Sequence, residues 1–177
     1  KADARSLQHL MTHVPKNSHC HICQRAKMEL PKSRRKGGVD RFKYDKFGEH
    51  FTVDSVDLHG LRNRGVGDMK NGLVFYDFGS RWLECIPTHS RSEDDTRHAF
   101  LEFLGTDIKP ECTCYSDKAP ELMKVAKELK LVASYSTPGV PRSNSIAESK
   151  VKLALHGARA ALLQAGLPAK YWLYAIK

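Results

Sequence analysis

The pattern of apolar and polar positions along the chain predicts a mixed β-sheet. Residues 50–58, HFTVDSVDL, carry β-branched and aromatic side chains at odd and even positions, which indicates a strand buried on both faces. Residues 72–88, GLVFYDFGSRWLECIPT, predict two more strands joined by a turn at residues 77–80. Two short strands are predicted over residues 111–117 and 131–136.

Helical patterns separate these strands. Residues 92–104 begin with Ser92, a favoured N-cap residue, continue with acids in the first turn and are followed by Gly105. Residues 119–130 repeat apolar side chains at the spacing of one helical face. Both segments are therefore predicted to be helices that cover the sheet.

The last part of the chain predicts one long helix and the start of another. The long helix runs from about Ser145 to Ala165, and Gly166 and Pro168 end it before residues 169–176 begin the next. Early antiparallel strands followed by alternating strands and helices favour an α/β domain with a mixed sheet flanked by helices.

Charge is distributed unevenly along the 177 residues. Lys and Arg outnumber Asp and Glu by twelve to four in residues 1–47 (+8) and by six to one in residues 141–177 (+5), whereas residues 48–140 have eleven against fifteen (−4). Basic segments of this kind suit a polyanion such as nucleic acid, and a solvated basic surface is the alternative.

Composition divides the chain into three parts. Residues 1–30 are rich in His and Cys, residues 31–47 form a basic, glycine-containing linker, and residues 48–177 form the folded domain. No apolar run approaches the roughly 18 residues needed to span a bilayer. The chain begins with Lys1 and ends in a helix-like stretch, so we expect it to be a fragment of a longer polyprotein.

The N-terminal segment predicts a zinc site. Its His-x3-His-x6-Cys-x2-Cys pattern joins half of a tetrahedral Zn²⁺ site to two histidines that can share a helix face. The expected ligands are His9, His13, Cys20 and Cys23. His19 and His21 are alternative ligands, and a His-rich tail with reduced thiols is the alternative to a metal site.

Five cysteines make an odd number, which disfavours a disulfide scaffold. Three of them lie in predicted strands, where we expect them to be core residues. These are Cys85, Cys112 and Cys114.

Three carboxylates stand out, each with a structural alternative. Asp54 lies among apolar residues of the predicted central strand, where an ionised carboxylate is costly to bury; a solvated edge position or a pair with a lysine is the alternative. Asp57, on the opposite face, is its local competitor. Asp117 ends a strand just before a helix, where capping would also explain it. Glu148 lies in the first turn of the long helix, where a capping box with Ser145 is the alternative.

Together the three acids predict a divalent-metal site. Carboxylates from two strands and a following helix can converge on one point, where they repel one another unless cations lie between them. Mg²⁺ or Mn²⁺ takes such hard oxygen ligands, and two ions can clamp the attacking and leaving oxygens of a phosphoryl displacement. We therefore expect two ions to be held by Asp54, Asp117 and Glu148.

The order of these acids resembles the D, D, E signature of retroviral and retrotransposon integrases. The matching segments are the strand with Asp54, YSD ending at Asp117, and TPGVPRSNSIAE ending at Glu148. The tail LLQAGLPAKYWLYAI resembles the copia-type branch. The chain departs from the family in having Lys118-Ala119 and Asn144-Ser145 where Asn-Gly is usual, and in a shorter interval between the last two acids.

The resemblance implies a fold and an activity. The fold is a ribonuclease H-like five-stranded sheet in the order 3-2-1-4-5, with a zinc knuckle at residues 1–30 and a C-terminally truncated integrase catalytic core at residues 48–177. The activity is 3′-end processing and DNA strand transfer by a divalent-metal-dependent polynucleotidyl transferase. Alternatives are a degenerate or domesticated copy that only binds nucleic acid, and another ribonuclease H-like nuclease.

The resemblance also implies partners. These are element ends and target DNA in the nucleus, after synthesis in the cytoplasm, with a homo-oligomeric assembly and no membrane contact. Basic residues are expected to contact DNA phosphates. They are Lys150, Lys152, Arg159, Arg142, Arg34, Arg35 and Lys36.

Overall fold

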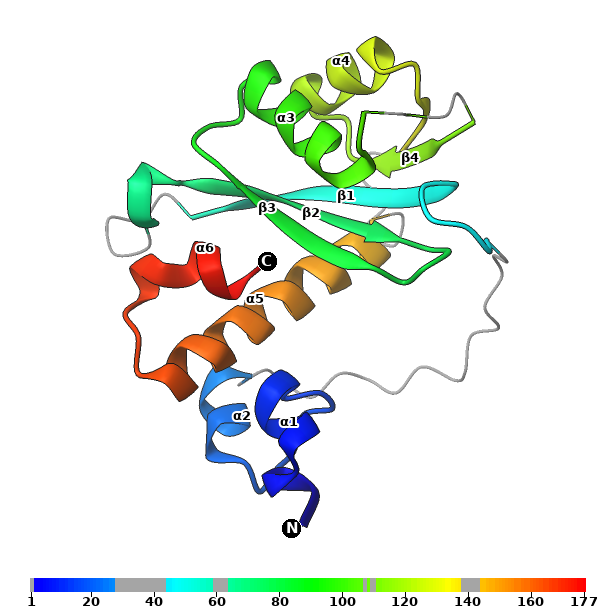
Figure 1. The fold of residues 1–177 in the computed structure, drawn as a ribbon. Helices are drawn as coiled ribbons and strands as arrows, with labels where there is room; N and C mark the ends of the chain where they lie inside the picture. The colour runs from blue at the N-terminus through cyan, green and yellow to red at the C-terminus, as the bar shows by residue number, and fades with distance from the viewer. Residues whose placement is uncertain (1, 28–43, 59–63, 107, 109–110, 138–143) are drawn as a thin grey trace.

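The computed structural model describes residues 2–27, 44–58, 64–106, 108, 111–137 and 144–177 (Figure 1). The N-terminal part contains η1 (Ala2–Arg5), α1 (Leu7–Thr12) and α2 (His21–Ala26). The rest contains β1 (His50–Asp57), η2 (Val66–Asp68), β2 (Asn71–Asp77), β3 (Leu83–Thr88), α3 (Glu93–Leu104), β4 (Thr113–Ser116), α4 (Pro120–Glu128), β5 (Val132–Tyr135), α5 (Ser145–Ala165), η3 (Ala169–Tyr171) and α6 (Trp172–Ala175).

One mixed sheet organises the chain, with strand order β3-β2-β1-β4-β5. The first three strands form an antiparallel meander, whereas β4 is parallel to β1 and β5 is parallel to β4. Parallel neighbours need crossover connections, and helices α3 and α4 lie in those connections. The predicted fold class, a 3-2-1-4-5 sheet flanked by helices, is confirmed.

Helices cover both faces of the sheet (Figure 1). On one face Phe51 and Val53 of β1 pack with Phe100 of α3 and with apolar residues of α4. On the other face Val56 packs with Ala158 of α5 and with α6. Strand β1 is therefore buried on both sides, as its sequence predicts, and the parity of a residue in β1 decides which helices it faces.

Helix ends follow the sequence signals closely. Ser92 caps α3, where its side chain accepts a hydrogen bond from the backbone N–H of Asp95, and Gly105 ends that helix with φ 78°. Gly166 ends α5 in the left-handed region with φ 66°. Only a residue tolerant of positive φ fits there without strain, which explains why the long helix ends at this glycine.

The three cysteines outside the N-terminal part are buried in the core, as predicted: Cys85, Cys112 and Cys114. Burial raises the pKa of the Cys85 thiol to about 12 and also raises the pKa of Cys114. Cys112 lies just before β4 rather than within it. These thiols are structural groups.

Two short helices of the N-terminal part, α1 and α2, pack against the C-terminal half of α5 (Figure 1). Residues 28–43, which hold most of the predicted linker together with Arg34, Arg35 and Lys36, lie outside the described residues. At the described end of that linker, Tyr44 stacks on His50 with 4.5 Å between ring centroids. No helix in the described part of the chain combines the length and apolar character needed to cross a bilayer.

Candidate active site and metal centre

Pairing between β1 and β4 brings Asp54 next to Asp117. The two strands are parallel, and Thr52 is paired with Tyr115. If that register is extended by two residues, Asp54 faces Asp117, which directly follows the last residue of β4. Across the sheet, Asp54 lies opposite Val74, which belongs to the apolar cluster under α5. Asp54 therefore lies on the face of the sheet that α5 covers, and Asp117 lies close enough for its charge to act on Asp54.

Glu148 reaches the same region from α5. The helix begins at Ser145 and its N-cap is Asn144, which makes no side-chain capping bond. The capping box of Ser145 with Glu148 is therefore wrong, because Ser145 is the first helical residue and not the cap. Glu148 is exposed in the first turn of α5, where its carboxylate can serve another role.

Capping of α4 by Asp117 is also wrong. The N-cap of α4 is Ala119, without a side-chain capping bond. Asp117 Oδ1 accepts a hydrogen bond of 3.2 Å from the backbone N–H of Ala119, which closes a turn between β4 and α4. The turn fixes the side chain of Asp117 at the carboxyl end of β4.

The pKa of Asp54 is raised well above its ordinary value. The pKa reaches about 6, mainly because of burial, and the negative charges of Asp117 and Glu148 act in the same direction. The backbone N–H of Ser55, which donates to Asp54 Oδ1 at 2.8 Å, opposes the shift. The nearby Arg91 opposes it as well. Both other carboxylates therefore lie close enough to repel the charge of Asp54.

The three carboxylates share a region without closing around one point. Within the described residues, only the N-terminal His/Cys quartet brings three or more metal-binding atoms within 4.8 Å of one another. Asn144 Nδ2 lies 3.5 Å from Asp54 Oδ2, and the side-chain oxygen Oδ1 of Asn144 is buried with no hydrogen-bond partner among the described residues. The oxygens of the three carboxylates and of the Asn144 side chain are hard ligands. They fit Mg²⁺ or Mn²⁺ that keeps some of its hydration water.

Asp57, the competitor of Asp54, is exposed at the end of β1. It lies three residues on from Asp54 and therefore points to the opposite face of the sheet. The negative charges that act on Asp54 come from Asp117 and Glu148. This placement favours Asp54 over Asp57 as the member of the acidic group.

The N-terminal quartet has the geometry of a tetrahedral metal site. Cys23 Sγ lies 3.5 Å from His9 Nε2 and 3.7 Å from His13 Nδ1, and Cys20 Sγ lies 3.6 Å from His13 Nδ1. Zn–N bonds of about 2.0 Å and Zn–S bonds of about 2.3 Å imply separations of roughly 3.5 Å between tetrahedral ligands. All four residues are buried, so the quartet can hold a zinc ion.

His19 and His21 are exposed and do not belong to the quartet. They are therefore not the ligands that this structure favours. His9 comes from α1 and His13 is the left-handed C-cap residue of that helix, with φ 51°. The turn at His13 brings its ring toward Cys23 of α2 and toward Cys20, the N-cap residue of that helix.

The basic residues predicted to contact DNA fall into three groups. Lys152 and Arg159 are exposed on α5, at helical spacing from Glu148. Lys150 is half-buried, and its Nζ lies 3.5 Å from the centre of the Tyr76 ring. Arg142 lies outside the described residues.

Two residues near the acidic group, Asn144 and Arg91, are not predicted by the sequence to belong to the site. Asn144 could have been found as an N-cap residue type before the long helix. Arg91 donates to Ser55 Oγ at 2.8 Å. Nothing in the sequence signals the Arg91 contact, because it joins positions 36 residues apart.

Comparison with solved structures supports the architecture. No model of a known protein family matches the chain, and no curated protein matches it. The crystal structure of the catalytic core domain of BIV integrase matches with a TM-score of 0.50, over 73% of this chain and 80% of that chain, at 12% sequence identity. The fold is ribonuclease H-like. Its central strand β1 and the adjacent β4 position Asp54 and Asp117, and the helix after β5 carries Glu148.

Replacing Asp54 with asparagine is expected to stabilise the metal-free protein above pH 6. The folded-state pKa of about 6 exceeds the ordinary value of 3.8, so unfolding releases a proton between these values. The free energy of unfolding of the wild type therefore decreases as the pH rises from about 4 to about 6, because the buried Asp54 loses its proton. Above pH 6 this loss of stability is complete. A shift of this size corresponds to roughly 2–3 kcal/mol after allowance for partial exposure.

Urea unfolding of both proteins in Mg²⁺-free buffer at pH 4 to 8 checks this expectation. The stability gain of Asp54→Asn over the wild type should grow as the pH rises through the window. Asp57→Asn, an exposed carboxylate in the same strand, is the matched control and should show a smaller dependence. A gain that does not change with pH would contradict the assigned burial of the Asp54 charge.

Proposed function

We propose that the protein is the integrase catalytic core of a copia-like retroelement. It would trim the 3′ ends of element DNA and transfer the new 3′-hydroxyl to target DNA in the nucleus. One observation carries the proposal: Asp54, Asp117 and Glu148 approach one another on the α5 face of a ribonuclease H-like sheet. The order of these acids and the copia-like tail support the same assignment.

The side chains would divide the work of the site. Asp54, Asp117 and Glu148 would hold two Mg²⁺ or Mn²⁺ ions, which supply activation of the attacking hydroxyl and stabilisation of the leaving oxygen. The backbone N–H of Ser55 donates a hydrogen bond to Asp54 Oδ1, and the side-chain amide of Asn144 lies beside Asp54 Oδ2. These contacts would orient the Asp54 carboxylate before any ion binds.

DNA would lie across the exposed basic side of α5. Lys152 and Arg159 would contact phosphates, which makes binding dependent on salt and largely independent of sequence. The zinc-bound quartet would be a structural centre, because all four ligand positions come from the protein and are buried. We further propose that the protein acts on DNA as a homo-oligomer and that it is made as part of a polyprotein.

A strand-transfer assay with the whole chain tests the proposed function. Blunt duplexes with randomised ends serve as donors and supercoiled plasmid serves as the target, with Mg²⁺ or Mn²⁺. We expect joined products and donor ends shortened at the 3′ side. DNA binding without joining in either metal would identify a nucleic-acid-binding protein instead, and strand cleavage without joining would identify a nuclease.

A further inference from the structure

The last turn of α5 contacts one of the four candidate zinc ligands. His13 Nε2 lies 2.6 Å from Gln164 Oε1, across 151 positions of the chain. The other nitrogen of the same ring, Nδ1, lies 3.6 Å from Cys20 Sγ and 3.7 Å from Cys23 Sγ. The two nitrogens of His13 therefore face different partners, with the sulfurs on one side and a carboxamide on the other.

Elementary chemistry assigns the proton of this imidazole. A ring nitrogen that binds a metal carries no proton, so Nδ1 facing the thiols requires the neutral ring to carry its proton on Nε2. A carboxamide oxygen is an acceptor only, and Gln164 Oε1 can therefore accept the proton on Nε2. Gln164 favours the one tautomer of His13 that can bind a metal through Nδ1.

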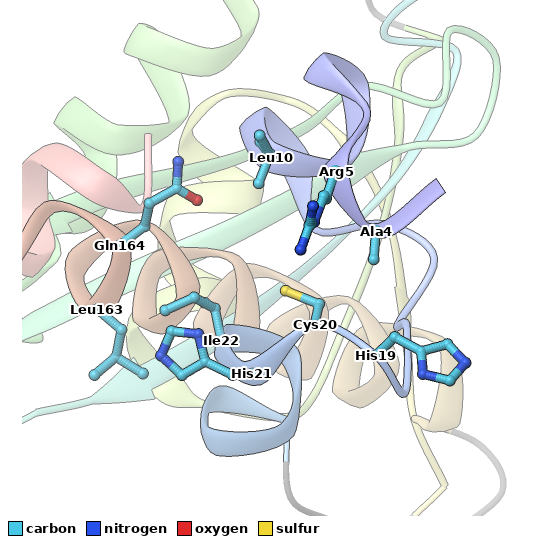
Figure 2. A pocket seen from close by; sticks show the side chains of 9 residues that line it. All are labelled: Ala4, Arg5, Leu10, His19, Cys20, His21, Ile22, Leu163 and Gln164. Atoms are coloured by element: carbon cyan, nitrogen blue, oxygen red, sulfur yellow. The ribbon is translucent and has the colours of Figure 1, made fainter. Parts of the chain in front are cut away.

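The surroundings make this bond important for the position of the N-terminal part. A cavity of about 900 Å³ opens at the junction of η1, α1, α2 and the end of α5, and Gln164 and Cys20 both line it (Figure 2). The apolar core within the N-terminal part is small, with Ala4, Cys20 and Cys23 buried and Ile22 packed against them. Because apolar packing at this open junction is sparse, the directional bond between His13 and Gln164 helps to fix the orientation of the N-terminal part on α5.

We propose that Gln164 is a positioning residue of the zinc site, and that its bond to His13 couples metal occupancy to the docking of residues 2–27 on α5. The inference rests on zinc binding by the quartet. Because coupling between two equilibria is reciprocal, docking on α5 raises zinc affinity by the factor by which zinc favours docking. Partners that orient metal-bound histidines typically change metal affinity by about 10–100-fold.

Three proteins test the coupling: the wild type, Gln164→Met, which keeps the length but removes the acceptor, and Gln164→Glu, which keeps an acceptor. Zinc affinity measured by chelator competition is expected to fall about 10–100-fold in Gln164→Met and to stay near the wild-type value in Gln164→Glu. Gln8→Met, an exposed position on α1, is the matched control and should bind zinc like the wild type.

Two further readouts separate positioning from a merely structural effect. Nitrogen NMR of the zinc-loaded wild type should show the His13 proton on Nε2. Zinc should slow amide exchange in the last turn of α5 in the wild type, and this protection should be lost in Gln164→Met.

Equal zinc affinity of Gln164→Met and the wild type would overturn the inference. A zinc-loaded His13 with its proton on Nδ1 would also overturn it, and this measurement needs no variant to fold. A wild type that binds no zinc would overturn the inference while leaving strand transfer to be decided by its own assay.

Discussion

Replacing Asp117 with asparagine is expected to reduce DNA joining by more than about 100-fold, the upper end of the loss typical for residues that only orient a metal ligand. Asparagine has nearly the same shape, and its side-chain oxygen can still accept the bond from the Ala119 N–H that closes the turn after β4. What the variant loses is the negative charge next to Asp54. The fold should therefore persist while the hold on divalent cations weakens.

Strand transfer and DNA binding must be measured together for this variant. Fluorescence anisotropy with a labelled duplex should show DNA affinity equal to or above that of the wild type, because a negative charge is removed from the surface proposed to face DNA phosphates. Asp57→Asn, which removes an exposed carboxylate from the same sheet, is the matched control and should join DNA normally. Joining at the wild-type rate by Asp117→Asn would refute the acidic site.

Removing zinc is expected to unfold residues 2–27 while the sheet stays folded. The N-terminal part has little apolar core of its own, and α1 and α2 have six residues each. Helices this short are unstable without tertiary support. Binding of structural zinc contributes about 10–16 kcal/mol in small zinc modules, which far exceeds what so small a core provides.

Hydrogen exchange with and without a chelator measures this effect. Amides of α1 and α2 should exchange freely once zinc is removed, whereas amides of β1 and β2 should keep their protection. Cys23→Ser should reproduce the loss, and His21→Ala, an exposed neighbour in α2, should not. Protection of α1 and α2 that survives metal removal would show that packing against α5 suffices.

Local signals in the sequence predict most of the fold. Apolar residues at both parities identify β1 as buried on both faces, and Ser92 and Gly105 mark the ends of α3. These signals act within a few residues, so they can be recognised in the sequence alone. The sequence alone does not fix the start of α5, because Asn144 and Ser145 are both favoured cap residues and only the backbone shows which of them is helical.

The candidate site depends on contacts that no local signal encodes. Asp54 and Asp117 come near each other because β1 and β4 are parallel neighbours, and the strand order follows from packing of the whole sheet. The bond between His13 and Gln164 and the position of Lys150 over Tyr76 likewise join distant segments. Residue types and the family resemblance identified the acids, whereas their partners had to come from the three-dimensional arrangement.

Helix α5 connects the acidic group at its first turn to the candidate zinc site at its last turn. Glu148 stands in its first turn and Gln164 in its last, so the two positions lie about 24 Å apart at a rise of 1.5 Å per residue. Inserting or deleting a single residue between them would rotate one end by about 100° against the other and misdirect either the acid or the amide. Related chains should therefore differ in length within their connecting segments and keep a constant count between these two positions.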